Sequence, residues 1–172
     1  EIYMGDWSSD VALPILVLRN NGTDDLQVNA DGGFTFATSL QSSAAYNITI
    51  AAQPTSPTQT CTLSNASGTV GGANVTNVAV SCITEEFTVG GTVSGLLGFG
   101  LVLQNNGSDN LAIAADGTFT FPASLPSGTP YNVAVASQPF LPVQACNVTN
   151  GAGTVGSANV ADVVVTCVTI GL

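Results

Sequence analysis

The chain repeats itself without a gap 85 residues later, and this internal repeat constrains its fold more than any other feature. The stretch "LVLRNNGTDDLQVNADGGFTFATSL" (16–40) recurs as "LVLQNNGSDNLAIAADGTFTFPASL" (101–125). Further on, "GTVGGANVTNVAVSC" (68–82) recurs as "GTVGSANVADVVVTC" (153–167). A repeat of this length holds a full set of strands and turns, whereas solenoid repeats are shorter. It therefore predicts two tandem domains, 1–84 and 85–172.

Each repeat has the residue pattern of an all-β sandwich. The segments "YNVAVAS" (131–137) and "VADVVVTCV" (160–168) are rich in β-branched residues. Pairs such as Asn106–Gly107 and Asp116–Gly117 tolerate the positive φ of tight hairpin turns. No segment keeps a helical period, and Gly or Pro punctuates the chain about every 8–12 residues. We therefore expect an all-β chain of two tandem sandwiches.

Four cysteines fall as one pair in each repeat, Cys61 with Cys82 and Cys146 with Cys167, and both pairs are 21 residues apart. Zinc is the alternative, but zinc sites need clustered Cys or His, and the chain has no His. We therefore predict one disulfide within each repeat, each contributing roughly 3 kcal/mol through chain entropy. Because disulfides persist in oxidising surroundings, the expected location is extracellular or at the cell surface.

The low and one-sided charge excludes several kinds of partner. Only 7% of the residues are charged, eleven acidic against the single basic Arg19, where an average soluble protein has roughly 25%. With so little positive charge to attract phosphates, neither nucleic acid nor an anionic membrane surface is an expected partner. The longest apolar run, "VALPILVL" (11–18), is too short to span a bilayer, so no membrane insertion is expected.

The order "GGTVSG…LVLQNN…ADGTFTFPASLPSGTPYNVAV", within residues 88–136, resembles two known families. These are the transthyretin-like sandwiches of the carboxypeptidase regulatory type and the B-type repeats of Gram-positive surface proteins. The resemblance implies Ig-like or transthyretin-like sandwiches of the kind found in tandem in bacterial secreted and surface proteins, and it implies no particular chemistry. Such surface repeats often carry a Lys–Asn isopeptide bond. This chain has no Lys, so the disulfide is expected to serve instead.

The residues needed for catalysis are sparse. Nucleophilic triads need a base, and the chain contains neither His nor Lys. Acid–base chemistry is left to carboxylates, but the candidates fall in predicted hairpin turns, where Asp caps the local backbone. We therefore expect a protein that is not an enzyme.

Calcium is the one cofactor that the acidic residues suggest. Turn acids on an anionic surface can supply the oxygen ligands that Ca²⁺ prefers. The natural group is Asp24, Asp25 and Asp31, and Glu85 and Glu86 lie in the linker between the repeats. No EF-hand-like motif is present, and solvated turn acids are the alternative interpretation.

The first sixteen residues, "EIYMGDWSSDVALPIL", depart from the repeat. Aligned at the same offset, they replace "EFTVGGTVSGLLGFGL" (86–101), and they hold the only Met and the only Trp of the chain, Met4 and Trp7. Large amphipathic side chains gathered at one end suit a contact surface. We therefore expect Ile2, Tyr3, Met4 and Trp7 to lie in an interface, with burial of Trp7 in its own domain as the alternative.

The last residues suggest what that interface joins. Leu172 aligns with Phe87, the start of a repeat, so Glu1 and Ile2 of a neighbouring copy would follow it in nearly the same register. Stacking of this kind does not close on itself and generates a filament. We therefore expect strand 1–16 and tail 168–172, with Ile170 and Leu172, to form a head-to-tail junction between copies. A first strand that crosses to a neighbour's sheet would be strand addition.

The sequence thus favours a non-enzymatic extracellular structural protein, a subunit of a surface fibre. One alternative is an adhesive or binding module with Trp7 and Tyr3 as a stacking platform for a carbohydrate, or with a protein ligand. Another is a passive spacer from a larger repeat protein. The chain shows no signal peptide and does not begin with Met, so a processed product or a fragment is expected.

Overall fold

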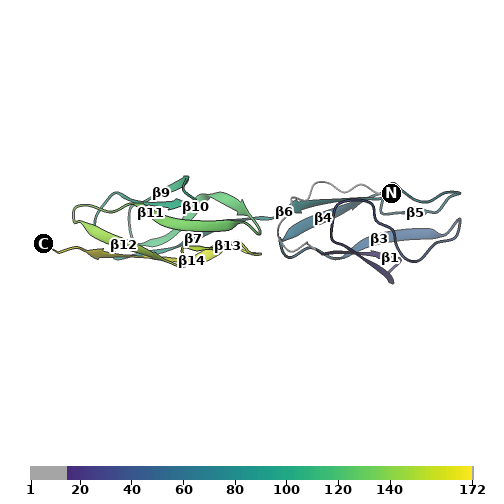
Figure 1. Cartoon of the computed structure of the whole chain (residues 1–172), viewed down its shortest axis with the longest axis horizontal. Helices are drawn as coiled ribbons and strands as arrows, with labels where there is room; N and C mark the ends of the chain where they lie inside the picture. The colour runs from purple at the N-terminus through teal and green to yellow at the C-terminus, as the bar shows by residue number, and fades with distance from the viewer. Residues whose placement is uncertain (1–14, 172) are drawn as a thin grey trace. The chain divides into compact units, whose positions relative to one another are not determined.

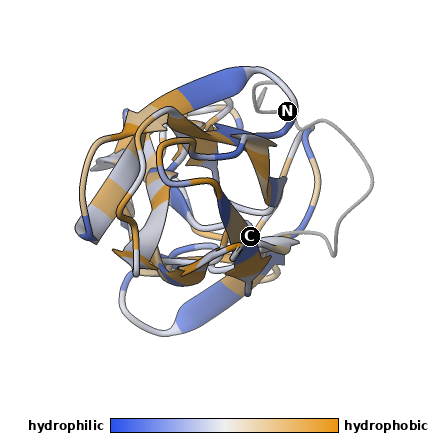
Figure 2. Ribbon diagram, turned by 90° about the vertical axis from the view of Figure 1, so that its left-hand side faces the viewer, coloured by the Kyte–Doolittle hydropathy of each residue, from blue (hydrophilic) through white to orange (hydrophobic). Residues whose placement is uncertain are grey.

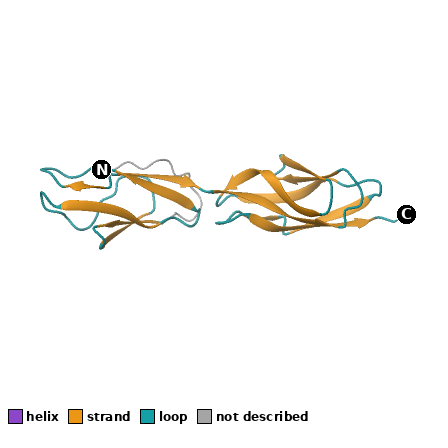
Figure 3. Ribbon diagram, turned by 180° about the vertical axis from the view of Figure 1, so that it is seen from behind, coloured by secondary structure: helices purple, strands orange, loops and turns teal. Residues whose placement is uncertain are grey.

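The structure is a computed structural model that describes residues 15–171. Within this range the chain consists of β-strands joined by turns and loops (Figure 3). It divides into two compact units, Glu1–Glu85 (unit 1) and Glu86–Leu172 (unit 2), and Figure 1 labels most of their strands. No helix between residues 15 and 171 is long and apolar enough to span a membrane.

Unit 2 is a β-sandwich of two four-stranded sheets. Its strands are β7 (Glu86–Ser94), β8 (Leu101–Asn105), β9 (Asp109–Ile113), β10 (Gly117–Pro126), β11 (Pro130–Ser137), β12 (Gln144–Thr149), β13 (Ala152–Thr154) and β14 (Val160–Thr169). One sheet has the order β10-β7-β14-β12 and the other β13-β11-β8-β9. Neighbours are antiparallel except for β7 and β14, which pair in parallel. Strand β7 therefore lies inside its sheet, with a partner on each side.

The core of unit 2 follows from the alternation of its strands. Val89, Leu101, Leu103, Val163 and Val165 are fully buried, and they come from both sheets. The residues between them along the strands point outward, as the two-residue period of a strand requires. A disulfide joins Cys146 of β12 to Cys167 of β14, whose Cα atoms are 4.0 Å apart.

Unit 1 has the same order of elements with fewer strands among its described residues. The strands are β1 (Leu16–Asn20), β2 (Asp24–Val28), β3 (Ala45–Ala52), β4 (Gln59–Ser64), β5 (Ser67–Thr69) and β6 (Ala79–Thr84). One sheet has the order β2-β1-β3-β5, and the other holds β4 and β6. The Cys61–Cys82 disulfide joins β4 and β6. The predicted fold class, two β-sandwiches with one disulfide in each, is confirmed.

The two units differ in the sheet that carries the disulfide. This sheet has four strands in unit 2, but only β4 and β6 form it among the described residues of unit 1. By the repeat, β10 matches residues 32–41, which form no strand, and β7 matches residues 1–9, which lie outside the described range. The segment "GGFTFATSL" (32–40) closely resembles "GTFTFPASL" (117–125), so its composition does not explain the missing strand. In unit 2, β10 pairs only with β7, so a strand at this position depends on that one partner.

Candidate functional site

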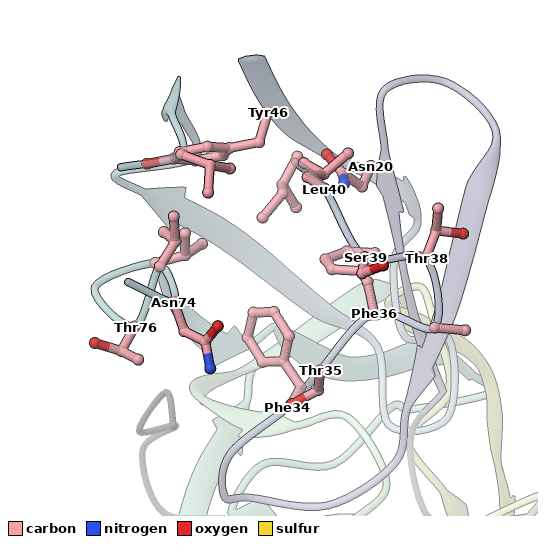
Figure 4. A pocket seen from close by; sticks show the side chains of 15 residues that line it. Asn20, Phe34, Thr35, Phe36, Thr38, Ser39, Leu40, Tyr46, Asn74 and Thr76 are labelled. Atoms are coloured by element: carbon pink, nitrogen blue, oxygen red, sulfur yellow. The ribbon is translucent and has the colours of Figure 1, made fainter. Parts of the chain in front are cut away.

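A groove of about 310 Å³ opens in unit 1 between the segment 34–40 and the segment 74–78 that leads into β6. Figure 4 shows Phe34 and Phe36 on one side of this hollow, with Asn74 and Thr76 across from Phe34. The groove is lined mainly by Asn20, Phe34, Thr35, Phe36, Thr38, Ser39, Leu40, Tyr46, Ile48, Val70, Asn74, Val75, Thr76 and Val78. We call it the unit 1 groove.

The unit 1 groove is the place that strand β7 occupies in unit 2. Phe119 of β10 is the register partner of Gly91, on one side of β7. Val160 of β14 is the register partner of Val89, on the other side. The residues that match Phe119 and Val160 in the repeat both line the groove. Among residues 15–171, the groove is therefore an open strand position.

The matched side chains are less buried in unit 1 than in unit 2. Phe121 is 1% exposed and Tyr131 is 8% exposed, whereas their counterparts Phe36 and Tyr46 are only half-buried. Burying apolar area is worth about 25 cal/mol per Å². A strand that entered the groove would therefore gain stabilisation by covering aromatic side chains whose counterparts are buried in unit 2.

Two glutamines at matching positions of the repeat differ in their hydrogen bonds between the two units. In unit 2 the Gln144 Oε1 accepts hydrogen bonds of 2.8 Å from the backbone N–H groups of Leu97 and Gly98. Its Nε2 donates to the Gly95 carbonyl at 2.7 Å. These three residues belong to the connection that leaves β7. The counterpart Gln59 is 9% exposed, and its Oε1 has no hydrogen-bond partner in the described part of the chain.

Unit 2 carries a different exposed feature, a cluster of apolar side chains at one end. Phe99 and Phe140 stack edge to face with ring centroids 4.3 Å apart, and their backbones exchange two hydrogen bonds. The Ile170 N–H donates to the Val143 carbonyl at 3.0 Å. The view in Figure 2 looks onto the end at which β14 finishes. We call this cluster the apolar end: Leu97, Phe99, Phe140, Leu141, Val143 and Ile170, all about half exposed or more.

The apolar end is specific to unit 2. The segment "PFLPV" (139–143) stands where unit 1 has "PTSPT" (54–58), so three apolar residues replace Thr55, Ser56 and Thr58. Exposed apolar patches on soluble domains commonly mark contact surfaces. Sequence reasoning missed this feature, although aligning the two repeats reveals it.

The acids proposed to bind calcium have other roles in the structure. Asp25 pairs with Arg19 through two hydrogen bonds, of 2.5 and 2.8 Å. This contact lowers the pKa of Asp25, chiefly through the hydrogen bond from Arg19. The Asp24 carboxylate accepts a hydrogen bond of 3.0 Å from the Thr38 N–H. Both residues therefore tie strand ends and turns together.

The two linker glutamates bind within separate units. Glu85 accepts a hydrogen bond from the Thr60 hydroxyl of unit 1, and Glu86 accepts one from the Ser124 hydroxyl of unit 2. Among residues 15–171, no three side chains of the kinds that ligate metals come together in one group. The structure therefore does not gather Asp24, Asp25, Asp31, Glu85 and Glu86 into one site, and calcium binding stays a prediction.

The interface residues predicted from the sequence fall mostly at the chain ends. Ile2, Tyr3, Met4, Trp7 and Leu172 lie outside the described residues. Ile170 is described, is 55% exposed and belongs to the apolar end. The unit 1 groove was not predicted. The available signal was that "GGFTFATSL" keeps its strand pattern while the segment aligned with its partner strand has changed.

Comparison with known proteins gives little on which to argue. No protein-family model and no curated protein sequence matches this chain. Among solved structures, the major pilin protein T-13 from Streptococcus pyogenes is similar at 13% sequence identity and a TM-score of 0.27. That match covers 98% of this chain and 95% of the pilin. At this TM-score the likeness supports no conclusion about fold or function.

Proposed function

We propose that this chain is a non-enzymatic extracellular structural protein whose copies assemble end to end into a surface fibre. The observation that carries the proposal is the unit 1 groove, an open strand position beside a β-strand edge. Exposed strand edges pair readily with strands of other chains, and strand addition is a common way for proteins to join. The absence of His and Lys from the sequence supports a structural rather than a catalytic role.

The second open surface explains why assembly would continue rather than stop at a dimer. The unit 1 groove and the apolar end lie on different units and have different shapes and residues. Contacts between two unlike surfaces are heterologous, and they extend into filaments unless the rotation between copies closes a ring. The low charge of the chain also reduces the cost of desolvation when copies pack.

Electron microscopy of the chain over a range of concentrations, beside sedimentation analysis, tests this proposal. The expected result is uniform fibres that appear above a threshold concentration. Parallel samples with a reductant and with a calcium chelator show whether disulfides or calcium hold the fibre. A chain that remains monomeric at the highest attainable concentration in every sample would exclude a fibre subunit.

The unit 1 groove also supports a second candidate function, a binding module. Its volume of about 310 Å³ falls at the lower end of the range for small-molecule pockets, about 300–1,000 Å³, and aromatic and hydroxyl side chains line it. Binding of short oligosaccharides or peptides to the monomeric chain, measured by calorimetry without any self-association, would favour this function over the fibre.

A further inference from the structure

We propose that the unit 1 groove is filled by residues 2–8 of a second copy, so that each copy donates its first segment to its neighbour. The inference deepens the proposed fibre and rests on it. Three observations carry it: the open strand position, the changed connection between residues 9 and 16, and the buried oxygen of Gln59.

The repeat identifies the segment that belongs in the groove. Residues 1–9 align without a gap with β7, which fills the matching position in unit 2. In unit 2 that strand runs parallel to β14. A strand formed by residues 2–8 would therefore lie parallel to β6 and pair on its other side with residues 33–41.

In unit 2 the connection after β7 depends on glycines. Gly95 and Gly100 have positive φ angles of 78° and 89°. A Cβ on Gly95 would lie 2.4 Å from a backbone carbonyl oxygen, and one on Gly98 would lie 2.6 Å from another. The Phe99 N–H donates to the Phe140 carbonyl at 3.0 Å. This tight path returns the chain from β7 to β8.

Unit 1 has lost every one of these features. Asp10, Leu13 and Ile15 stand in place of the three glycines, and Pro14, which has no N–H, stands in place of Phe99. Side chains at such positions meet backbone atoms or require a strained φ. Residues 10–15 therefore do not have the composition on which the return from β7 to β8 depends in unit 2. A segment that cannot fold back can still reach another copy, as in domain swapping.

The buried oxygen of Gln59 points the same way. Its counterpart Gln144 receives two backbone N–H groups from the connection after β7, whereas Gln59 Oε1 has no partner within residues 15–171. A buried acceptor without a partner costs free energy. Gln59 Oε1 therefore has an unused hydrogen-bonding position, among the described residues, where the segment that follows a strand in the groove would pass.

The glycine in the donated segment selects its register. In unit 2 a Cβ on Gly91 would lie 1.7 Å from the Val163 carbonyl oxygen, so a side chain cannot occupy this place. The repeat alignment puts Asp6 there, but a shift of one residue puts Gly5 there instead. A donated strand takes this shifted register because no tight connection fixes it.

The shifted register also places the aromatic side chains of the segment. Tyr3 and Trp7 then take the places of the buried Val89 and Val93. Met4 takes the place of Gly90, where in unit 2 a Cβ would lie 2.3 Å from the Phe119 carbonyl oxygen of β10, so the segment that matches β10 must shift away. In unit 1 the matching segment 32–41 is not held in a strand, so it has room to adjust.

Cysteine cross-linking between two differently tagged full-length chains tests the donation. One chain carries Tyr3→Cys and the other carries Val75→Cys, which matches Val160, the register partner of Val89. We expect a covalent heterodimer on a non-reducing gel, in at least tenfold higher yield than with Val160→Cys, whose position in unit 2 β7 already covers. Met4→Cys in place of Tyr3→Cys tests the register, and faster cross-linking of Met4→Cys would overturn the one-residue shift.

The result that overturns the donation is equally specific. If the mixture gives no heterodimer while a single chain with Y3C and V75C closes an internal disulfide, each copy fills its own groove. Heterodimers without fibres in the microscope would retain the donation and exclude the fibre. Fibres without heterodimers would retain the fibre and exclude the donation.

A second variant restores the connection of unit 2. The substitutions D10G, L13G, P14F and I15G recreate the residues at positions 95–100 that allow the return to β8. We expect this chain to fill its own groove, so that it stays monomeric at concentrations where the parent chain assembles. Unchanged assembly of this variant would contradict the role assigned to the connection.

Discussion

The two matched glutamines show how one residue can have different effects in two nearly identical settings. Gln144 satisfies two buried N–H groups and one carbonyl of the connection after β7. Gln59 is also buried, but only its Nε2 has a hydrogen-bond partner, the Thr84 hydroxyl. The sequence shows both residues in the same context, "QTC" and "QAC". Only the structure shows that the side-chain oxygen of Gln144 has hydrogen-bond donors in the connection after β7, whereas that of Gln59 has none among the described residues.

We therefore expect unequal costs when each glutamine is replaced by alanine. Gln144→Ala leaves two backbone N–H groups of the connection without an acceptor, and should lower the free energy of unfolding of unit 2 by about 2–4 kcal/mol. Gln59→Ala removes one hydrogen bond, and should cost unit 1 about 1 kcal/mol. Urea unfolding followed by hydrogen exchange of peptides from each unit measures both. Equal losses in the two units would contradict this account.

The ion pair between Arg19 and Asp25 has a pH dependence with a defined sign. The folded-state pKa of Asp25 is lowered by the hydrogen bond from Arg19. The stability that this pair contributes is therefore present above the unfolded-state pKa of Asp25, and it is lost as the pH falls through the lower folded-state pKa. Asp25→Asn should be less stable than the parent chain at pH 7, and the difference should disappear in strong acid.

Thermal unfolding between pH 2 and pH 7 measures this difference. Both side chains are substantially exposed, so the effect should be small and should shrink at high salt. The control is Arg19→Gln, in whose background Asp25→Asn should no longer change the pH dependence. A pH-dependent effect of equal size in that background would assign it to a different partner of Asp25.

At the scale of the elements, strand propensity predicted which segments could form strands. Pairing with a neighbouring strand determined which of them are strands in the structure. The alternating residues predicted β11 and β14, and both are strands in the structure. The pair Asn106–Gly107 predicted a hairpin turn, and it lies between β8 and β9. The segments 32–40 and 117–125 have nearly the same residues, but only the second is a strand, because β7 pairs with it. No property of the segment itself predicts that difference.

This dependence on a partner predicts a difference in hydrogen exchange. In the dilute, monomeric chain, the amides of residues 34–40 should exchange at least tenfold faster than those of residues 119–125, which the β7 pairing protects. On assembly, exchange at 34–40 should slow toward the rate at 119–125, because a donated strand supplies the missing partner. Mass spectrometry of the two matched peptides measures both. Rapid exchange at 34–40 that persists in the fibre would show that assembly leaves the groove open.

For the whole molecule, the sequence predicted well the features that both repeats share, and poorly the features that only one repeat has. The equal spacing of the cysteines predicted both disulfides, because each pair links neighbouring strands in the same way in its unit. The unit 1 groove and the apolar end were not predicted, because each depends on a difference between the repeats. The alignment shows which residues differ, but only the fold places them at a strand position and at an exposed end. The open surfaces proposed for assembly are these two departures from the repeat.

The apolar end therefore provides a test by exchange between the repeats. Replacing Phe140, Leu141 and Val143 with their unit 1 counterparts, as F140T, L141S and V143T, removes three of the six exposed apolar side chains of the apolar end, and none of the three lies in a strand. We expect the concentration at which half of the chains are assembled to rise at least tenfold, which corresponds to about 1.4 kcal/mol. The control is Ile83→Ser, which removes an apolar side chain that is 72% exposed in unit 1, and it should leave assembly unchanged. Sedimentation velocity measures each chain. If the control weakens assembly as much as the triple substitution, general hydrophobicity rather than the apolar end joins the copies.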